Sequence, residues 1–495
     1  MRTPGTMLWF TLALGCLTMQ LDAQQASDSQ ADAKQQLQQV LGLLQQTQQQ
    51  LNQSQKEIDQ LRARLQQVEA QLKGGGNSPP VVTGTSVGAL QQAVEALQDS
   101  QRMTQAAVAQ HAQVKVETES KYGLQVSGLV LFNAISNSER VDSIDLPLLA
   151  VPYAGNSSEG SLAATMRQSI LGLDATGPTL WGARSSANVE IDFFGGLSPA
   201  DYTSSAGNVR LRTAFTRLDW VNSSIAAELA APIVSPLSPT SYASVGEPAL
   251  AWSGNLWLWA PQLAASHRVH TGRSSFVNGE FALIDPSAPG PASDATLRQP
   301  NPAESSRRPG VEGRLSYSSS VGEHAFVLGA GGYYSRQNYG YGQRGNAWAG
   351  TADWKLPIGP RVEFSGEFYR GQGLGGLGGG TFKDYVTHPG SGAINELNAV
   401  GGWSQLKFIL SRQFELNAAI GQDNGFAKEI RASDSATNTD PYAALARNRT
   451  AFGNLIYRPR AYLLFSGEYR DIHTWQITGP VQSSQSLSLA AGYIF

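Results

Sequence analysis

Alternation of apolar and polar residues dominates the sequence from position 122 to its last residue. In the segment 463–470, for example, two sets of residues take alternate positions: Leu463, Phe465, Gly467 and Tyr469 against Ser466, Glu468 and Arg470. A period of two predicts a β-strand with one apolar and one polar face. Because similar alternation occurs at 188–193, 209–215, 361–369, 405–410, 414–420 and 486–495, we expect this part of the chain to be all-β.

The apolar face of such strands can point into the core of a soluble sandwich, or outward into lipid around a barrel with a polar lumen. Long irregular segments favour the barrel, where long loops are normal at one end. They lie at 136–160, 232–254, 284–309, 371–400 and 421–448. No run of 18 apolar residues exists, which excludes a helical membrane protein. At roughly 23 residues per strand with its share of loop, residues 122–495 predict an all-β transmembrane antiparallel barrel of about 16 strands.

The two ends of the sequence carry export and assembly signals. Residues 1–23 combine a positive charge, a short apolar run at 7–17 and a small-residue cleavage site, which predicts a signal peptide. Cys16, the only cysteine, is either removed with this peptide or serves as a lipid-attachment site. At the other end, Tyr493 and the terminal Phe495 resemble the signal that the barrel assembly machinery of the bacterial outer membrane recognises.

A helical region precedes the barrel and predicts an α-helical coiled coil. Within 24–73, six apolar residues recur every seven positions: Leu37, Leu44, Leu51, Ile58, Leu65 and Leu72. A sustained heptad of this kind joins copies of a chain in a supercoil. Residues 74–86 form a Gly- and Pro-containing hinge, and 87–121 carry a second heptad run. Because barrel termini face the periplasm, we expect both helical segments there.

Several segments resemble the DcaP-like outer-membrane porins. They are 128–134, 167–169, 188–195, 210–215, 236–239 and 254–262, together with the N-terminal heptads and the terminal Phe. The resemblance implies a homotrimeric, 16-stranded porin with a periplasmic helical extension, which takes up small, often anionic solutes such as dicarboxylates. This chain departs from the family at Trp259 and Ala260, because family members tend to have an Arg before the Pro-Gln element. A basic lumen group is therefore missing, and the expected preference for anions is weakened.

Charged residues on the polar strand faces are the candidates to line the pore and contact solutes. They are Arg184, Glu190, Asp192, Arg210, Arg212, Glu312, Arg314, Glu363 and Glu367. Opposed charges across a lumen orient dipolar solutes, and Arg pairs bidentately with carboxylates. The same residues can instead neutralise one another as cross-strand pairs, as Glu312 and Arg314 would. The Pro-rich segment 232–248 either folds into the lumen and narrows it, or forms an external loop.

Two functions from different classes fit this sequence. The first is a porin for passive diffusion of small hydrophilic solutes, embedded in outer-membrane lipid. The alternative is a closed barrel that anchors a periplasmic coiled-coil rod, but the recurring Arg and Glu favour the channel. A formal net charge of −3 lacks the basic surplus that nucleic-acid binding requires. We expect no enzyme, cofactor or metal, because only His267 and His270 of the six histidines are close and no catalytic set accompanies them.

Overall fold

The computed structural model describes residues 123–153, 155, 159–196, 207–288, 298–321, 324–433 and 442–495. The predicted signal peptide (1–23), coiled coil (24–73), hinge (74–86) and second helical segment (87–121) lie outside these residues. The described α-helices are short, namely α3 (Pro302–Ser305) and α4 (Ala427–Arg431). None of the helices among the described residues has the length and apolar character needed to cross a membrane.

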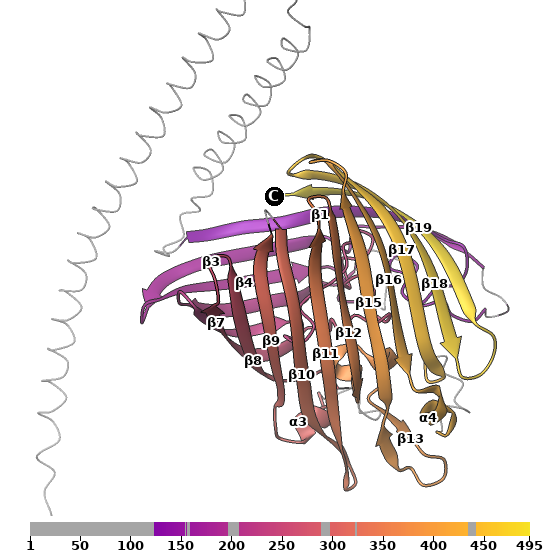
Figure 1. Ribbon diagram of the computed structural model, residues 1–495. Helices are drawn as coiled ribbons and strands as arrows, with labels where there is room; N and C mark the ends of the chain where they lie inside the picture. The colour runs from indigo at the N-terminus through magenta and orange to yellow at the C-terminus, as the bar shows by residue number, and fades with distance from the viewer. Residues whose placement is uncertain are drawn as a thin grey trace, which may run out of the picture. The chain divides into compact units, whose positions relative to one another are not determined.

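One sheet of seventeen strands forms the wall of the molecule (Figure 1). Its strands are β1 (Gly123–Asn137), β2 (Ser161–Thr165), β3 (Ile170–Leu180), β4 (Ala183–Asp192), β5 (Arg210–Asp219), β6 (Ser223–Ala230), β7 (Ala260–His270), β8 (Ser275–Ile284), β9 (Gly310–Val321), β10 (His324–Gly340), β11 (Gln343–Ile358), β12 (Val362–Gln372), β15 (Asn398–Ile409), β16 (Phe414–Gly425), β17 (Leu445–Arg460), β18 (Leu463–Gln476) and β19 (Gln482–Ile494). A separate small hairpin consists of β13 (Tyr385–Thr387) and β14 (Ile394–Glu396).

The sheet closes on itself through β1. One edge of β1 pairs with β19, and the other pairs first with β3 and then with β2, always antiparallel. Since β2 and β3 follow one another along the same neighbour, they are one strand interrupted at residues 166–169. The seventeen strands therefore make a closed barrel of sixteen, which confirms the predicted count. Closure leaves no unpaired edge of the sheet.

The two ends of the barrel differ in their connections. At the end where β1 begins and the chain terminates, called here the turn end, the links are short, such as residues 181–182 and 461–462. At the opposite loop end, where α3, α4 and β13 lie in Figure 1, most connections are long. They span 138–160, 193–209, 231–259, 285–309, 373–397 and 426–444. The predicted irregular segments are thus confirmed, although β16 and β17 extend further and shorten the last one.

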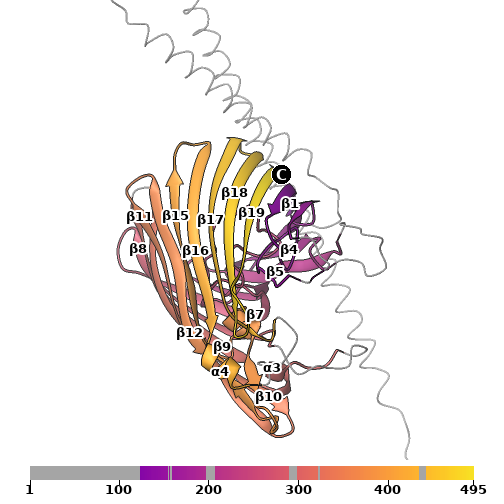
Figure 2. The same cartoon turned by 90° about the vertical axis from the view of Figure 1, so that its right-hand side faces the viewer.

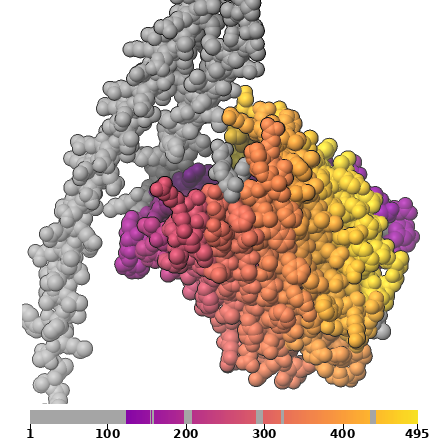
Figure 3. Space-filling model, in the orientation of Figure 1, coloured from indigo at the N-terminus to yellow at the C-terminus, as the bar shows by residue number. Residues whose placement is uncertain are grey.

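Strand length divides the barrel into a low wall and a tall wall. The low wall, β3–β8, consists of strands of 8 to 11 residues. In the tall wall, β9–β19, three strands reach 16 or 17 residues. Figure 2 shows the long tall-wall strands side by side, and Figure 3 shows their outer surface as one continuous face from orange to yellow.

Outward-facing side chains over the middle of the tall wall are apolar. Leu455, Phe465 and Tyr469 are examples, each about half exposed. Toward the turn end, aromatic rings on this face contact one another with centroids 4.5–6.4 Å apart: Trp354 with Phe364, Phe414 with Tyr457, Tyr457 with Phe465, and Tyr462 with Tyr493. An apolar band bordered by aromatic rings is the surface that a lipid bilayer requires of a barrel.

A bulge in β5 changes which residues face the lumen. The pairing with β4 shifts by one residue next to Glu190, and Arg212 is the extra residue. Thr213 then donates a hydrogen bond to Glu190 (3.1 Å), so it faces inward like Arg210. Phe215 also faces inward, with the Arg217 guanidinium over its ring. Simple alternation placed Phe215 on the outward face, and this detail was wrong.

Three loops from the loop end pack inside the barrel, namely 138–160, 231–259 and 373–397. Buried apolar side chains of the second and third loops join lumen-facing wall residues in one cluster that includes Val234, Leu256, Leu374, Leu377, Tyr333 and Tyr369. The third loop contributes two short 3₁₀ turns, η1 (Gly375–Leu377) and η2 (Gly380–Phe382). A further cluster joins Leu146 and Leu148 of the first loop to Trp257 of the second. The molecule therefore has a hydrophobic core inside the loop half of its barrel.

Candidate functional site

Residues 231–259, called here the inner loop, run along the inside of the tall wall. Their polar groups donate hydrogen bonds to four wall side chains: Ile233 N to Glu312 (2.7 Å), Leu237 N to Glu367 (2.7 Å), Thr240 N to Gln405 (2.7 Å) and the Ser241 hydroxyl to Glu468 (2.5 Å). The acceptors stand on β9, β12, β15 and β18. Of the two placements left open for 232–248, the structure thus shows the one inside the barrel, where the segment narrows the lumen.

Two of these acceptors belong to one repeated sequence pattern. Segments 364–368 and 465–469 both have Phe-Ser-Gly-Glu followed by an aromatic residue. In each strand the Glu faces the lumen and accepts a hydroxyl hydrogen bond from the inner loop, Glu367 from Ser235 and Glu468 from Ser241. The pattern therefore builds two anchors for the same loop, on strands that are four positions apart in the barrel.

The interruption between β2 and β3 supplies another anchor. The Gln168 side-chain oxygen accepts hydrogen bonds from the backbone N–H groups of Val245 (2.6 Å) and Gly246 (2.8 Å). Beside it, Arg167 makes a buried bidentate ion pair with Asp145 of the 138–160 loop (2.9 and 2.7 Å). A regular strand points successive side chains to opposite faces. The break allows two consecutive residues to hold loops inside the barrel.

Four predicted residues on β4 and β5 come together. Asp192 has no exposed side-chain surface and lies 2.9 Å from Arg210 and 3.3 Å from Arg212. Glu190 lies 3.9 Å from Arg212, and 37 % of its side chain is exposed. Because Asp192 is buried, it pairs with the two arginines and is not accessible from the lumen. Glu190 remains open to the lumen. The cross-strand pairing expected from sequence is therefore present, and Glu190 is the most exposed of the four side chains.

Both arginines also hold the inner loop. Arg212 donates to the carbonyl oxygen of Val245 (2.5 Å), and Arg210 donates to that of Gly246. Their guanidinium groups lie over the ring of Trp259, at 5.2 Å for Arg210 and 4.5 Å for Arg212. Trp259 is the residue at which the sequence departs from the porin family. Here its ring covers two cations and reduces their access to a passing anion.

Glu312 and Arg314 were expected to pair, and this expectation was wrong. Glu312 accepts the backbone N–H of Ile233, while Arg314 binds Asp353 of β11 through two hydrogen bonds (2.8 and 2.7 Å) and contacts Glu280 of β8. Both residues face the lumen from β9. The inner loop supplies the hydrogen-bond donor for Glu312, whereas carboxylates of the neighbouring strands pair with Arg314. Arg314 has only 6 % of its side chain exposed, so it is a structural ion pair.

The remaining predicted pore residues lie nearer the turn end or in the anchors. Glu363 pairs with Lys355 at 3.4 Å, and Glu367 is the inner-loop acceptor described above. Arg184 is exposed near the turn end of β4 and has no ion pair within the described residues. Arg184 and Glu363 are therefore not brought together with the cluster at Asp192.

The predicted assembly signal lies where the barrel closes. Tyr493 faces outward and is half exposed. The backbone of Phe495 exchanges two hydrogen bonds with Gly128 of β1 (2.9 and 3.1 Å). A role of these two residues in assembly stays a prediction.

Accessible lumen charges form two groups. The first, on β3–β6, contains three carboxylates and two arginines: Asp174, Glu190, Glu228, Arg212 and Arg217. The second, on β11–β17, contains three bases and two carboxylates: Lys355, Lys407, Arg458, Glu363 and Glu415. Strand order places β4 eight positions from β12 in a barrel of sixteen, so the groups stand on opposite sides. Lumen-facing charges of both signs thus stand on opposite sides of the barrel, as in a lumen that orients dipolar solutes.

Sequence analysis did not identify the basic residues of the second group, Lys355, Lys407 and Arg458. Lys407 and Arg458 both approach Glu415, at 3.5 and 3.4 Å, from the two neighbouring strands. Lys407 and Glu415 do occupy polar positions of alternating segments, so the period-two pattern could have found them. Gln168 carried no such signal, because its role depends on a break in the strand.

Within the loops 138–160 and 231–259, two of the described carboxyl groups have raised pKa values. Burial raises the pKa of Glu247, in the inner loop, to about 7, and the nearby charge of Asp142 adds to the rise. Burial also raises the pKa of Asp142 to about 6, although hydrogen bonds from the N–H groups of Leu149 and Leu148 oppose this. The Oε2 atom of Glu247 is buried without a hydrogen-bond partner among the described residues. Its proton therefore influences how the two loops pack together.

The histidine pair lies near the turn end of β7. His267 contacts the Ser223 hydroxyl (2.8 Å), and the ring of His270 lies 6.1 Å from that of Phe276. Among the residues that the structure describes, no three potential ligands from His, Cys, Asp and Glu gather in a metal-binding group. The pair is engaged in local contacts at the strand end.

Comparison with solved structures places this wall among outer-membrane barrels. The outer membrane channel DcaP of Acinetobacter baumannii superimposes with a TM-score of 0.57 at 15 % identity, over 76 % of this chain and 99 % of that chain. The barrel has the fold of a DcaP-like porin. The resemblance seen in the sequence is thereby confirmed for the fold.

Two other solved structures are similar to the barrel. An anion-selective porin from Comamonas acidovorans gives a TM-score of 0.48 at 10 % identity, over 76 % of this chain and 100 % of that chain. OprB of Pseudomonas putida gives 0.48 at 9 % identity, over 75 % and 94 %. No family model and no curated protein sequence matches the chain.

Proposed function

We propose that this chain is a trimeric outer-membrane porin through which small hydrophilic solutes diffuse passively. The observation that carries the proposal is the pair of opposed groups of accessible charge in the lumen. A barrel used only as an anchor has no need for unburied charges facing each other across its interior. The fold that the chain shares with an outer-membrane channel supports the same function.

The two groups act on a solute as an oriented field. A dipolar solute turns its negative end toward Lys407 and Arg458 and its positive end toward Glu190 on the opposite side. The exposed cations of the tall wall are Lys355, Lys407 and Arg458. On the low wall, Trp259 and Asp192 cover Arg210 and Arg212, and Arg217 is paired with Glu228. Small carboxylates are therefore expected to pass along the tall wall, with contacts too weak to trap them.

The low wall is the proposed contact between protomers. Its outward positions carry no charged side chain in the described residues, and they include half-exposed Leu173, Leu211 and Leu263. Its strands are also too short to present the height of the tall wall. An uncharged surface on one side of the barrel suits burial against a second and third copy of the chain.

One observation favours a second function, a closed barrel that anchors a periplasmic segment. The three loops inside the barrel (138–160, 231–259 and 373–397) bury apolar side chains against each other. Leu374 and Leu377 of the third loop have no exposed surface. A lumen filled in this way across its whole section would conduct no ions. The two functions therefore differ in whether a path remains beside the inner loop.

Single-channel conductance of the purified, refolded mature protein in a planar bilayer separates the two functions. We expect current steps in groups of three. The double substitution Lys407→Gln/Arg458→Gln removes the accessible bases, so the reversal potential in a salt gradient should shift toward cation selectivity. The matched control Arg336→Gln/Arg344→Gln changes the same charge on the outer face and should leave the potential unchanged. A folded barrel that carries no current would contradict the porin function and favour the anchor function.

A further inference from the structure

Two arginines project from the outer face of β17 near the loop end without a partner of opposite charge. The guanidinium groups of Arg447 and Arg449 lie 5.4 and 5.3 Å from the ring of Trp475 on β18, one on each of two neighbouring outward positions. Arg447 also donates to the Asn424 side chain (3.1 Å). Within the described part of the chain neither arginine makes an ion pair. Two adjacent like charges held in place by one indole attract an anion with several oxygen atoms.

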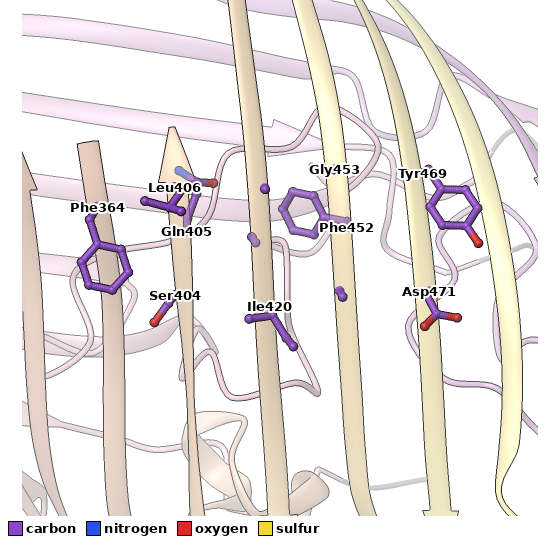
Figure 4. A pocket seen from close by; sticks show the side chains of 12 residues that line it. Phe364, Ser404, Gln405, Leu406, Ile420, Phe452, Gly453, Tyr469 and Asp471 are labelled. Carbon is purple, nitrogen blue, oxygen red and sulfur yellow. The ribbon is translucent and has the colours of Figure 1, made fainter. Parts of the chain in front are cut away.

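Figure 4 shows a hollow in the same outer face. It lies on the side of these arginines toward the turn end, because its residues Ala451 and Gly453 follow Arg449 along β17. It has a volume of about 510 Å³. Small outward residues on three adjacent strands lower the surface here: Ser404, Ala418, Ala451 and Gly453. Larger side chains stand around them: Phe364, Leu406, Ile420 and Tyr469. Ala451 and Gly453 are the next outward positions after Arg449, about 7 Å apart along the strand. The cations and the hollow therefore form one continuous surface.

Outward-facing cations occur on the tall wall and not on the low wall. Arg336, Arg344 and Arg370 occupy loop-end positions of β10, β11 and β12, whereas β3–β8 have no charged outward residue among those described. Asp471 is the carboxylate among the residues that line the hollow; it lies 3.3 Å from His473 and accepts a hydrogen bond from Gln485 (3.0 Å). Cations thus accompany the part of the wall that faces lipid in the proposed trimer.

We propose that this surface binds a phosphorylated glycolipid of the outer leaflet, of the lipid A type. Its phosphate would lie on Arg447 and Arg449, and one acyl chain would lie in the hollow. The order of the two features matches such a lipid, because the cations are at the loop end, which faces the cell exterior in barrels of this kind, and the apolar hollow is deeper in the wall. The proposal rests on the outer-membrane placement given under the proposed function.

Native mass spectrometry of the detergent-purified full-length oligomer, titrated with bisphosphorylated lipid A, tests the proposal. Each basic residue near an anionic membrane surface contributes about 1 kcal/mol, so Arg447→Gln/Arg449→Gln should weaken binding about thirty-fold. Lys428→Gln/Arg431→Gln on α4 removes the same charge from the exposed loop end and should not change the affinity. Dephosphorylated lipid A should bind the unaltered protein as weakly as the diphosphate binds the first variant.

A second variant tests the hollow without altering charge. A side chain at Gly453 meets only ordinary contacts, with Asn417 O at 3.8 Å, so Gly453→Phe should fold and occupy the hollow. We expect it to weaken lipid A binding several-fold. Unchanged affinity in both variants would overturn the proposal, and equally tight binding of phosphatidylglycerol would show that any phosphate headgroup suffices and overturn the choice of glycolipid.

Conductance of the same preparations separates this proposal from the porin function. Arg447→Gln/Arg449→Gln is expected to conduct like the unaltered protein, because both residues lie outside the lumen. A barrel that binds lipid A but carries no current would contradict the porin function alone. A conducting barrel with no phosphate-dependent binding would contradict the lipid site alone.

Discussion

Lumen-facing carboxylates differ in what surrounds them. Glu367 and Glu468 have at most 5 % of their surface exposed and accept hydrogen bonds from the inner loop. Glu190 has 37 % of its side chain exposed, accepts a hydrogen bond from the Thr213 hydroxyl (3.1 Å) and has its nearest arginine at 3.9 Å. A buried donor that loses its acceptor costs about 1–3 kcal/mol, which a solvent-exposed donor does not. The first kind of carboxylate therefore holds structure, and the second is available to solutes.

Glu367→Ala tests this distinction. It leaves the Ser235 hydroxyl and the Leu237 N–H without their acceptor in a buried place, so we expect a loss of about 2–4 kcal/mol in the free energy of unfolding. The loosened loop should also make the single-channel current noisier. Glu363→Ala is the matched control, because its Lys355 partner is 37 % exposed and the pair contributes less than about 1 kcal/mol. Equal losses in chemical unfolding of the two variants would show that Glu367 is no anchor.

Among the elements, the strands could be predicted from the sequence and the inner loop could not. Alternation identifies strands because every second residue meets the same environment. The position of 231–259 depends on hydrogen bonds to residues such as Gln168, Gln405 and Glu468, which no local pattern reveals. The bulge at Arg212 likewise could not be predicted, and it places Phe215 on the lumen side instead of the outward side that alternation predicts. The candidate charges were found on β4 and β5, but their position opposite a second group of charges needed the strand order.

The inner loop should pack less tightly as pH rises. The pKa of Glu247 is about 7 in the folded protein, above the usual 4.5, so the folded state holds this proton more tightly than the unfolded state. Loop packing is then most stable below about pH 4.5 and loses stability as pH rises through 7. Hydrogen exchange of amides 243–250, corrected for intrinsic rates, should become about ten-fold faster or more from pH 5 to 8.

Glu247→Gln should remove most of this pH dependence, since an amide stays neutral throughout. The exposed Glu159 lies in the neighbouring loop, and Glu159→Gln is the control that should retain the dependence. Exchange in the Glu247→Gln protein that accelerates as much as in the unaltered protein would assign the effect to another group, such as Asp142 with its pKa of about 6.

For the whole molecule, the difference between its walls determines what each side of the barrel contacts. The tall wall has the aromatic girdle, the outward arginines and the longest strands. The low wall has short strands and an uncharged outward face. The proposed trimer, in which three low walls would meet at the centre and lipid would cover the tall walls, accounts for this division.

Substitution on the low wall should dissociate the proposed trimer. Leu173→Gln/Leu211→Gln places amides in the proposed contact, and light scattering of the detergent-solubilised protein should show a shift from trimer toward monomer. The control Leu406→Gln/Leu455→Gln makes the same change on the tall wall, where detergent covers the surface, and should leave the mass unchanged. A trimer that persists in the first variant, or dissociates equally in both, would place the interface elsewhere.

The anchors of the inner loop also constrain the order in which the barrel folds. Gln168 precedes the loop in the chain, whereas Glu468 follows Ser241 by 227 residues. The loop cannot reach its final place until β18 has joined the sheet and the last strands have closed against β1. Contacts of such long sequence separation form late. A partly folded barrel therefore lacks the anchored inner loop, and the lumen reaches its final width only when the last strands have closed the barrel.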